Sequence, residues 1–195
     1  MGMKMFSLHD INDEAAAKLP RPSLVGLTPL DVPIPVSLEE AISSPFGGYW
    51  LDAITKEIGI LNEHGTWTFV RAPPDRRPIG SKWILGVKPH CSGDGSIGKF
   101  KARMVAQGFS QRKGIDYKEV FSPVANLEAI RLQLAMSAHY GLKLRHIDIV
   151  KAFLNGDMDT DVHMVQPPGT AKHGEEHLVC KLLKSLYGLK QAGRT

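Results

Sequence analysis

The stretch between residues 82 and 106 constrains the fold most strongly, because its pattern predicts a β-hairpin. One arm covers residues 82–88, a glycine-containing turn covers residues 92–95, and the other arm covers residues 97–106. Cationic and apolar residues alternate along the second arm: Lys99, Lys101 and Arg103 against Phe100, Ala102 and Met104. Successive strand side chains point to opposite faces, so the three cations share one face. Because like charges in a row repel one another, this face is either open to solvent or covered by an anion such as a phosphate.

The charge of the chain is concentrated around this hairpin. The whole chain of 195 residues carries a net charge of +4. Residues 71–113 hold ten Lys and Arg against two Asp, which gives +8 for this segment and leaves −4 for the remainder. A basic block of this kind suits a phosphate-rich partner such as a nucleic acid, although a solvated surface has the same composition.

Other classes of protein find little support in the sequence. No apolar run approaches the roughly 18 residues of a membrane span, so we expect no membrane partner. Cys91 and Cys180 stand alone, without a neighbouring Cys or a His cluster. We therefore expect two reduced thiols in an intracellular protein and no structural zinc site.

Local patterns predict a mixed α+β fold behind an N-terminal arm. Residues 1–36 contain five prolines and few aromatic residues, which predicts a linker or poorly ordered arm. Ser37 begins a capping box for a short helix. A longer helix follows, with one apolar face and Gly65 as its end; the face comprises Trp50, Ile54, Ile58 and Leu61. Residues 66–70 alternate as a strand, and residues 162–165 and 178–180 are weaker strand candidates.

The second half of the chain predicts one more helix and a strand. Asn126 can cap a helix that runs to about Tyr140 and ends at Gly141. We expect its stripe of Leu127, Ile130, Leu134 and Ala138 to be buried. Residues 142–149 then read as an apolar strand.

This strand carries Asp148 near its end, directly before a turn at residues 151–156. An aspartate in this position either caps the turn or binds a metal ion. Ala152 is small, so the turn offers room for a metal-bound triphosphate. Phe153 is bulky, and its aromatic ring would lie under the sugar and exclude a 2′-hydroxyl. His146 lies on the same strand face, where a packed histidine is the simpler interpretation.

A second acidic group has the spacing that opens a calcium loop. It comprises Asp157, Asp159 and Asp161. A calcium loop also needs Gly at its sixth position and Glu at its twelfth, where this chain has Val162 and Pro168. The pattern therefore favours a solvated turn over a calcium site.

Several short sequence motifs resemble motifs of the reverse transcriptase of copia-type long-terminal-repeat retrotransposons and follow the same order along the chain. They are the helix from Trp50 to Asn62 with Thr66-Trp67, Ile79-Gly80-Ser81-Lys82-Trp83, residues 101–111, Gly114-Ile115-Asp116-Tyr117, Phe121-Ser122-Pro123-Val124, residues 152–156, Gln166-Pro167-Pro168-Gly169, and residues 184–191. Together they span roughly three quarters of the chain. Because so many motifs match in the same order, the resemblance is not due to chance.

The resemblance implies a right-hand polymerase architecture. Residues 37–195 would form a partial reverse transcriptase domain after the arm at residues 1–36. Within it, residues 49–125 would form much of the fingers and residues 126–195 an incomplete palm.

The resemblance also implies roles for individual residues near the turn. Asp148 resembles the first catalytic aspartate, which binds both magnesium ions, with the backbone carbonyl of Ile149 as an auxiliary ligand. Phe153 resembles the steric gate that rejects ribonucleotides. The reaction of the family is templated nucleotidyl transfer by two-metal phosphoryl transfer.

Nucleotide-binding residues are implied outside the turn as well. Lys101 and Arg103 resemble the fingers cations that hold the incoming triphosphate. The loop from Tyr187 to Gln191 resembles the one that packs under the template base and the nucleotide. The implied partners are an RNA or DNA template-primer, a dNTP, and the rest of a polyprotein with the remaining palm, thumb and RNase H regions.

One family feature is missing from these 195 residues. The Tyr-x-Asp-Asp tetrad, which carries the other catalytic acids, does not occur, so we expect the chain alone to lack polymerase activity and to be marginally stable. The alternative is a non-catalytic relic that at most binds nucleic acid through the basic fingers surface. The family implies an intracellular location, in cytoplasmic virus-like particles or the nucleus.

Overall fold

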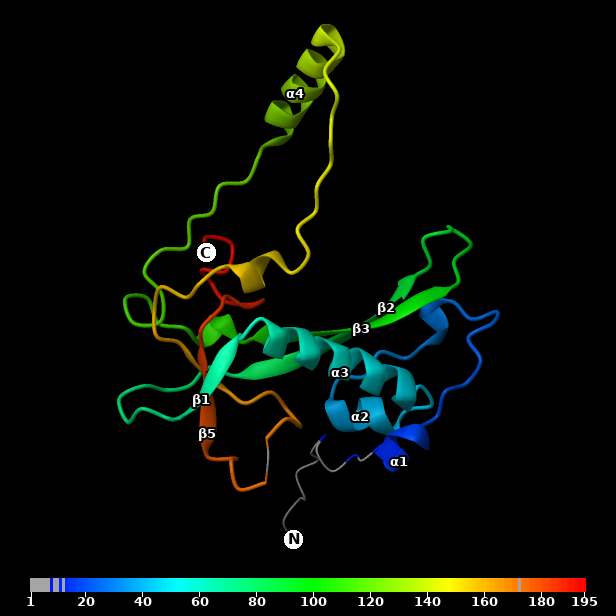
Figure 1. Ribbon diagram of the computed structural model, residues 1–195, viewed down its shortest axis with the longest axis vertical. Coiled ribbons are helices and arrows are strands. Elements are labelled where there is room, and N and C mark those ends of the chain that lie inside the picture. Colours follow the sequence, from blue (N-terminus) through cyan, green and yellow to red (C-terminus); the bar gives the residue numbers. More distant parts are fainter. Residues whose placement is uncertain (1–7, 9–10, 12, 172) are drawn as a thin grey trace.

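The computed structural model describes residues 8, 11, 13–171 and 173–195, which form an α+β body and one projecting helix (Figure 1). The elements in chain order are α1 (Asp13–Ala17), η2 (Pro29–Asp31), α2 (Leu38–Ser43), α3 (Gly47–Glu63), β1 (Trp67–Arg71), β2 (Ser81–Pro89), β3 (Ile97–Ala106), η3 (Gly108–Ser110), α4 (Leu127–Tyr140), η4 (Ala152–Asn155), β4 (His163–Val165) and β5 (Leu178–Leu182). No described helix is long and apolar enough to cross a membrane.

The predicted hairpin is confirmed as the antiparallel pair β2–β3. Its register runs from Ser81 opposite Ala106 to Pro89 opposite Ile97, with an irregularity next to Pro89. Gly93 and Gly95 adopt the positive φ angles of 77° and 76° that the tight turn requires. The apolar positions of β3 pack against α3, while the cationic positions face the other way.

Helix α3 lies across the hairpin and supplies much of the core. Trp50 and Ile54 have no exposed surface, and Leu61 retains 1%. The Trp50 and Phe100 rings meet edge to face with centroids 4.7 Å apart. The predicted apolar face is confirmed: Ile58 is half-buried and packs against the core. Glu57 next to it is buried as well.

A second sheet has the strand order β1–β5–β4, and both pairs are antiparallel. Phe69 and Met164 flank Cys180 on its two sides. The amide of Ile79 donates to the carbonyl of His163 at 2.8 Å, and the amide of Val165 donates to the carbonyl of Ile79 at 2.8 Å. These bonds join the second sheet to the start of the hairpin. The three strands predicted from residues 66–70, 162–165 and 178–180 are therefore confirmed.

The prediction of a poorly ordered arm at residues 1–36 is wrong for the described residues 13–36. The carbonyl of Pro20 accepts from the Gly48 amide at 3.1 Å, and Arg21 pairs with Asp52 at 2.9 Å. The Tyr49 hydroxyl donates to the carbonyl of Pro22 at 2.9 Å. Prolines cannot donate backbone hydrogen bonds, but their carbonyls accept here. Leu24, Leu27 and Val32 pack in or against the core, whereas Val25, Leu30 and Val36 are exposed. Residues 1–7, 9–10 and 12 of the predicted arm lie outside the described residues.

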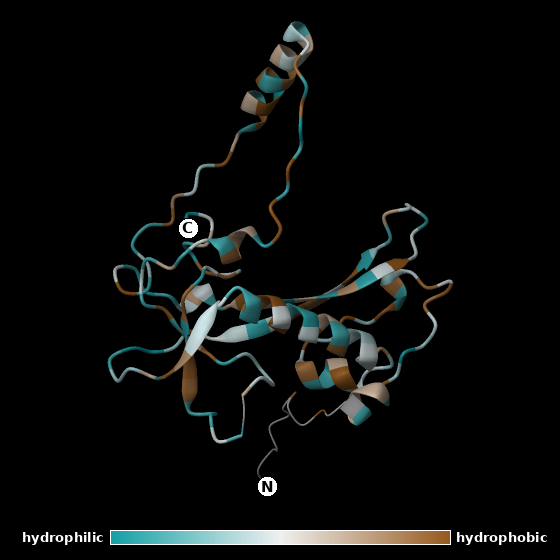
Figure 2. Ribbon diagram, viewed as in Figure 1, coloured by the Kyte–Doolittle hydropathy of each residue, from teal (hydrophilic) through white to brown (hydrophobic). Residues whose placement is uncertain are grey.

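Helix α4 has the predicted ends. The Asn126 side chain accepts from the Ala129 amide at 2.8 Å, and Gly141 closes the helix in the left-handed conformation. However, the predicted burial of its stripe is wrong, because Leu127, Ile130 and Leu134 are 54%, 44% and 50% exposed. Figure 1 shows why: α4 projects from the body on two extended segments, and no described element packs against it. Apolar residues are coloured brown along α4 in Figure 2, and the large hydrophobic side chains of this helix are at least 44% exposed.

The predicted strand at residues 142–149 is also wrong. The segment is extended, but its residues pair with no strand among the described residues, and all of them are exposed. A strand is defined by its ladder of hydrogen bonds to a neighbour, and an apolar sequence alone does not supply that neighbour.

Candidate functional site

Four residues predicted to bind a nucleotide lie together in the structure. Lys101 and Arg103 lie on β3, Phe153 lies on η4, and Tyr187 lies in the loop after β5. The guanidinium carbon of Arg103 is 5.4 Å from the centroid of the Tyr187 ring. The Tyr187 and Phe153 rings meet edge to face with centroids 4.8 Å apart. The contacts thus join three segments that are separated in the sequence.

The backbone at the end of β3 sets the position of Tyr187. The amide of Ala106 donates to the carbonyl of Tyr187 at 2.8 Å. Gly188 follows with a φ of 88°, and a Cβ at this glycine would lie 2.1 Å from the carbonyl oxygen of Ala106. A Cβ at Gly108 would likewise lie 2.1 Å from the carbonyl oxygen of Gly188. Two glycines therefore allow the loop to contact the strand backbone directly and hold the ring over Arg103.

Four of the five cationic residues of the hairpin form what we call the basic face: Lys88, Lys99, Lys101 and Arg103. Lys88 lies opposite Lys99, and Gly86 lies opposite Lys101 and adds no side chain there. None of the four pairs with a carboxylate within the part of the chain that the structure describes. Partial burial lowers the pKa of Lys101, and the neighbouring charges of Arg103, Lys88, Lys99 and Lys151 lower it further. A bound anion would relieve this repulsion.

A buried ion pair lies beside the turn that carries Phe153. The Lys151 ammonium donates to the Glu57 carboxylate of α3, and their side chains are only 16% and 6% exposed. Sequence reasoning did not identify this pair. The sequence does contain an indication: Glu57 comes three residues after Ile54 and four before Leu61, so it shares their buried face of α3. A charged residue at such a position requires a partner of opposite charge.

Asp148 and Ile149 lie in the extended segment before this turn and are exposed, with Ile149 at 64%. The described residues contain no cluster of three or more His, Cys, Asp or Glu side chains that could hold a metal ion. Magnesium prefers several oxygen ligands in octahedral geometry, and Asp148 offers one carboxylate. The residues present therefore do not fit a two-ion magnesium centre by themselves, and the metal roles of Asp148 and Ile149 stay predictions.

Gln191 is buried and supports the loop from within. It is 1% exposed, its amide nitrogen donates to the carbonyl of Asp116 at 3.0 Å, and its oxygen accepts from Gln111 at 3.1 Å. The amide of Lys190 donates to the Gln111 side chain at 2.8 Å. Gln191 thus contacts other protein groups, whereas Gly188 and Lys190 are the exposed residues of the loop and Tyr187 is half-buried.

The three acids with calcium-like spacing each have a cation as partner. Asp157 pairs with Lys184 at 2.7 Å, Asp159 with Arg194 at 2.9 Å, and Asp161 with Lys181 at 2.7 Å. These pairs connect the turn to the C-terminal segment. They support the interpretation of a solvated, structural turn.

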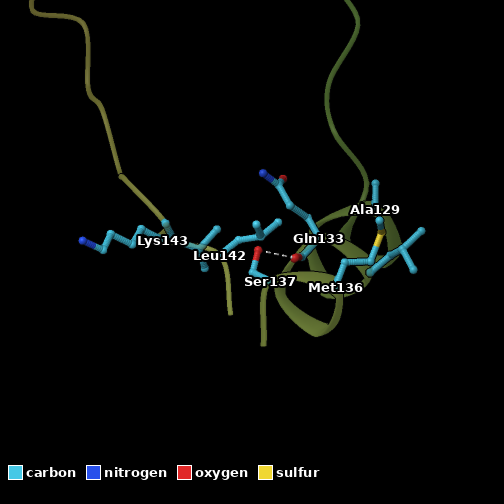
Figure 3. Close-up of a pocket in the computed structure, with 8 residues that line it drawn as sticks. Ala129, Gln133, Met136, Ser137, Leu142 and Lys143 are labelled. Carbon is cyan, nitrogen blue, oxygen red and sulfur yellow. Dashed lines mark hydrogen bonds between the residues drawn. The ribbon is translucent and has the colours of Figure 1, made fainter. Parts of the chain in front are cut away.

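An apolar hollow lies away from this cluster. It has a volume of about 340 Å³ and lies between α4 and the residues that follow it (Figure 3). Its lining includes Leu132, Met136 and Leu142, and the Ser137 hydroxyl beside it donates to the carbonyl of Gln133 at 2.8 Å. Since it lacks a cluster of charged groups, it does not resemble a nucleotide site.

Comparison with known proteins identifies relatives of the whole site region. The family model for reverse transcriptase (RNA-dependent DNA polymerase) matches residues 64–195. The chain is 42% identical over 160 residues to the retrovirus-related Pol polyprotein from transposon TNT 1-94 of Nicotiana tabacum, an alignment that covers 82% of this chain and 12% of the relative. It is 42% identical over 146 residues to the Pol polyprotein from transposon RE1 of Arabidopsis thaliana, covering 74% of this chain and 10% of that protein.

A more distant similarity extends to yeast. The chain is 28% identical over 149 residues to the truncated transposon Ty1-A Gag-Pol polyprotein of Saccharomyces cerevisiae, covering 74% of this chain and 12% of the relative. The chain therefore spans about a tenth of the length of the curated relatives it matches. No solved structure was found to match it.

Proposed function

The chain belongs to the reverse transcriptase (RNA-dependent DNA polymerase) family, and from this premise we propose that its basic face binds the triphosphate of an incoming nucleotide. In this proposal, residues 49–125 serve as fingers and residues 126–195 as part of a palm. DNA synthesis on an RNA template would be an activity of a larger Pol polyprotein, to which this chain contributes nucleotide-binding parts.

The observation that carries the proposal is the arrangement of Lys101, Arg103, Tyr187 and Phe153. Neither cation has a carboxylate partner among the described residues, and Arg103 lies over the Tyr187 ring, which in turn contacts Phe153. A triphosphate carries several negative charges, and its transfer depends mainly on positioning and charge neutralisation. The cations would supply the neutralisation, while the rings would offer a flat, apolar surface to the sugar.

Phe153 has the support that a steric gate requires. Its ring rests on Tyr187, and Leu154 beside it is buried with 1% exposure. A ring held in this way can exclude a 2′-hydroxyl, because neither the ring nor the turn can move aside at low cost. We propose that this contact favours deoxynucleotides over ribonucleotides.

Asp148 would contribute one carboxylate to a catalytic centre that the described residues do not complete. We therefore propose that the chain alone does not polymerise nucleotides. A primer-extension assay with an RNA template and magnesium tests this statement. Templated incorporation by the chain alone, abolished by Asp148→Ala, would overturn it.

Nucleotide binding can be tested without catalysis. Calorimetric titration with dTTP in the absence of metal should show at least about tenfold weaker binding for the double variant Lys101→Ala/Arg103→Ala, because each charge-assisted hydrogen bond contributes about 1.5–3 kcal/mol. Lys118→Ala is the matched control, since Lys118 is exposed but lies outside the basic face. Unchanged dTTP affinity in the double variant would refute the assignment.

A second candidate function is non-specific nucleic-acid binding by a non-catalytic relic. The net charge of +8 in residues 71–113 favours it, because phosphate contacts alone give affinity for any strand. Single-stranded DNA would then bind with a steep salt dependence, and dTTP would neither bind measurably nor compete. In-frame translation of the genomic DNA that follows the codon for Thr195 provides independent information: a Tyr-x-Asp-Asp segment would favour the polymerase, and stop codons would favour the relic.

A further inference from the structure

We propose that Glu57 is a positioning residue: its ion pair with Lys151 fixes the turn at residues 151–156 on helix α3 and so sets the place of Phe153. The consequence for nucleotide selection rests on the proposed function. The attachment of the turn to α3 through this pair follows from the structure alone.

Burial makes this pair different from the other ion pairs of the chain. Glu57 and Lys151 are 6% and 16% exposed, whereas every other described pair has at least one side chain that is 41% or more exposed. A buried charge that loses its partner is left without solvation. Neither residue can therefore leave the other without a large penalty, and the pair acts as a fixed connection between segments 94 residues apart.

The backbone of Lys151 supports the same view. It has a φ of 55°, and no other non-glycine residue in the described part of the chain has a positive φ. A side chain other than glycine, asparagine or aspartate pays for this conformation, so another interaction has to hold it. The ion pair is the interaction that the structure shows for the side chain of this residue.

The turn that follows is short and depends on its first residue. The amide of Leu154 donates to the carbonyl of Lys151 at 2.9 Å, and the amide of Gly156 donates to the carbonyl of Phe153 at 3.1 Å. Phe153, which contacts Tyr187, lies between these two bonds. A shift of Lys151 would thus move the Phe153 ring relative to Tyr187 and the basic face.

On the other side of Lys151 the chain is not held. Residues 141–150 are all exposed, and Asp148 lies among them, three residues before Lys151. The pair with Glu57 is therefore the attachment to the body from which the Asp148 segment departs.

The test is a double-mutant cycle with hydrogen exchange as its readout. The variants are Glu57→Gln, Lys151→Met and the two combined, with Glu63→Gln as the matched control on an exposed position of α3. We expect the Leu154 and Gly156 amides to exchange at least about tenfold faster in each single variant, with no change in the control. The combined variant should exchange no faster than either single variant, because the second change removes an already unpaired charge.

Three results would overturn the inference. Unchanged exchange rates of the Leu154 and Gly156 amides in Glu57→Gln would show that the ion pair does not stabilise the turn. Strictly additive effects in the combined variant would show that the residues act separately. An equal increase in exchange throughout α3 and β3 would show that the pair contributes to overall stability and not to the position of the turn.

A second measurement separates this inference from the proposed function. The ratio of dTTP to UTP affinity should fall in Glu57→Gln, because Phe153 loses its fixed place, and should stay unchanged in Glu63→Gln. Failure of dTTP to bind to the wild-type chain would refute the proposed function, while the exchange data would still decide whether the pair positions the turn. If the Leu154 and Gly156 amides lose protection in Glu57→Gln but the ratio of dTTP to UTP affinity does not change, Glu57 stabilises the turn and has no role in nucleotide selection.

Discussion

Replacing one isoleucine in each of two helices should reveal which helix belongs to the core. Ile54 of α3 has no exposed surface, and Ile130 of α4 is 44% exposed although its sequence pattern predicts burial. Ile54→Ala and Ile130→Ala remove the same atoms from the same type of element. The two substitutions therefore differ only in what surrounds the side chain.

The expected magnitudes differ clearly. Ile54 packs in the cluster that includes Trp50, Leu61 and Met104. Truncating a fully buried isoleucine costs about 2–5 kcal/mol, since it removes apolar burial and leaves a cavity. Ile130 is already half in water, and alanine is the better helix former by a few tenths of a kcal/mol, so we expect a loss below about 1 kcal/mol.

Denaturant unfolding followed by tryptophan fluorescence measures the difference. Trp50 and Trp83 are buried in the body with 0% and 8% exposure, so the signal reports on the core. The midpoint should fall strongly for Ile54→Ala and little for Ile130→Ala, with equal m-values. Equal losses for the two variants would refute the reasoning, and a loss for Ile130→Ala that grows with protein concentration would show that α4 is covered by a second copy in solution.

Four further predictions concern the site and the thiols. Gly188→Ala should destabilise the chain by about 1–3 kcal/mol in the same assay, because of its positive φ and its contact with a β3 carbonyl, whereas Gly59→Ala, in open space on α3, should stabilise it by up to about 1 kcal/mol. Binding of dTTP should weaken as pH rises, because the protonated form of Lys101 is the one that binds. Since the pKa of Lys101 is lowered, this weakening should begin at a lower pH than it would with a lysine of ordinary pKa. Lys101→Ala should remove this part of the pH profile in calorimetry. Cys91 is exposed and should react with a thiol reagent at once, while burial raises the pKa of Cys180 to about 12 and should keep it unreactive until the chain unfolds. Since the unfolded chain loses the Cys180 proton near pH 9.0 and the folded chain retains it, this residue should lower stability as pH rises above that value, an effect that Cys180→Ala would abolish.

Local signals in the sequence predicted the ends of elements well. Asn126 and Gly141 act through hydrogen bonds and φ angles within a few residues, so they fix the ends of α4 wherever that helix lies. The alternation along residues 97–106 predicted both the strand and the direction of its cations for the same reason. These features need no partner from a distant part of the chain.

Burial and pairing could not be predicted in this way, because they depend on which other segments are present. The apolar stripe of α4 and the run at residues 142–149 have the sequences of a core helix and a core strand, yet no described element covers either. Glu57 is the opposite case: a charged residue is buried on α3, because Lys151, which lies 94 positions away in the sequence, pairs with it. The cluster of Arg103, Tyr187 and Phe153 could be expected only from the family resemblance.

The buried side of the loop that carries Tyr187 is attached by hydrogen bonds between uncharged groups, and the Lys190 ammonium adds a bond to the carbonyl of Gln111 at 3.3 Å. Gln191 and Gln111 bond to each other and to the carbonyl of Asp116, and the Ala106 amide bonds to the carbonyl of Tyr187. Ionic strength screens charges that face solvent but has little effect on buried amide hydrogen bonds. Raising the salt concentration should therefore weaken the attraction of the basic face for phosphate while the aromatic surface beside it keeps its shape. A salt titration of nucleotide binding would then separate the electrostatic share of the affinity from the share contributed by the rings.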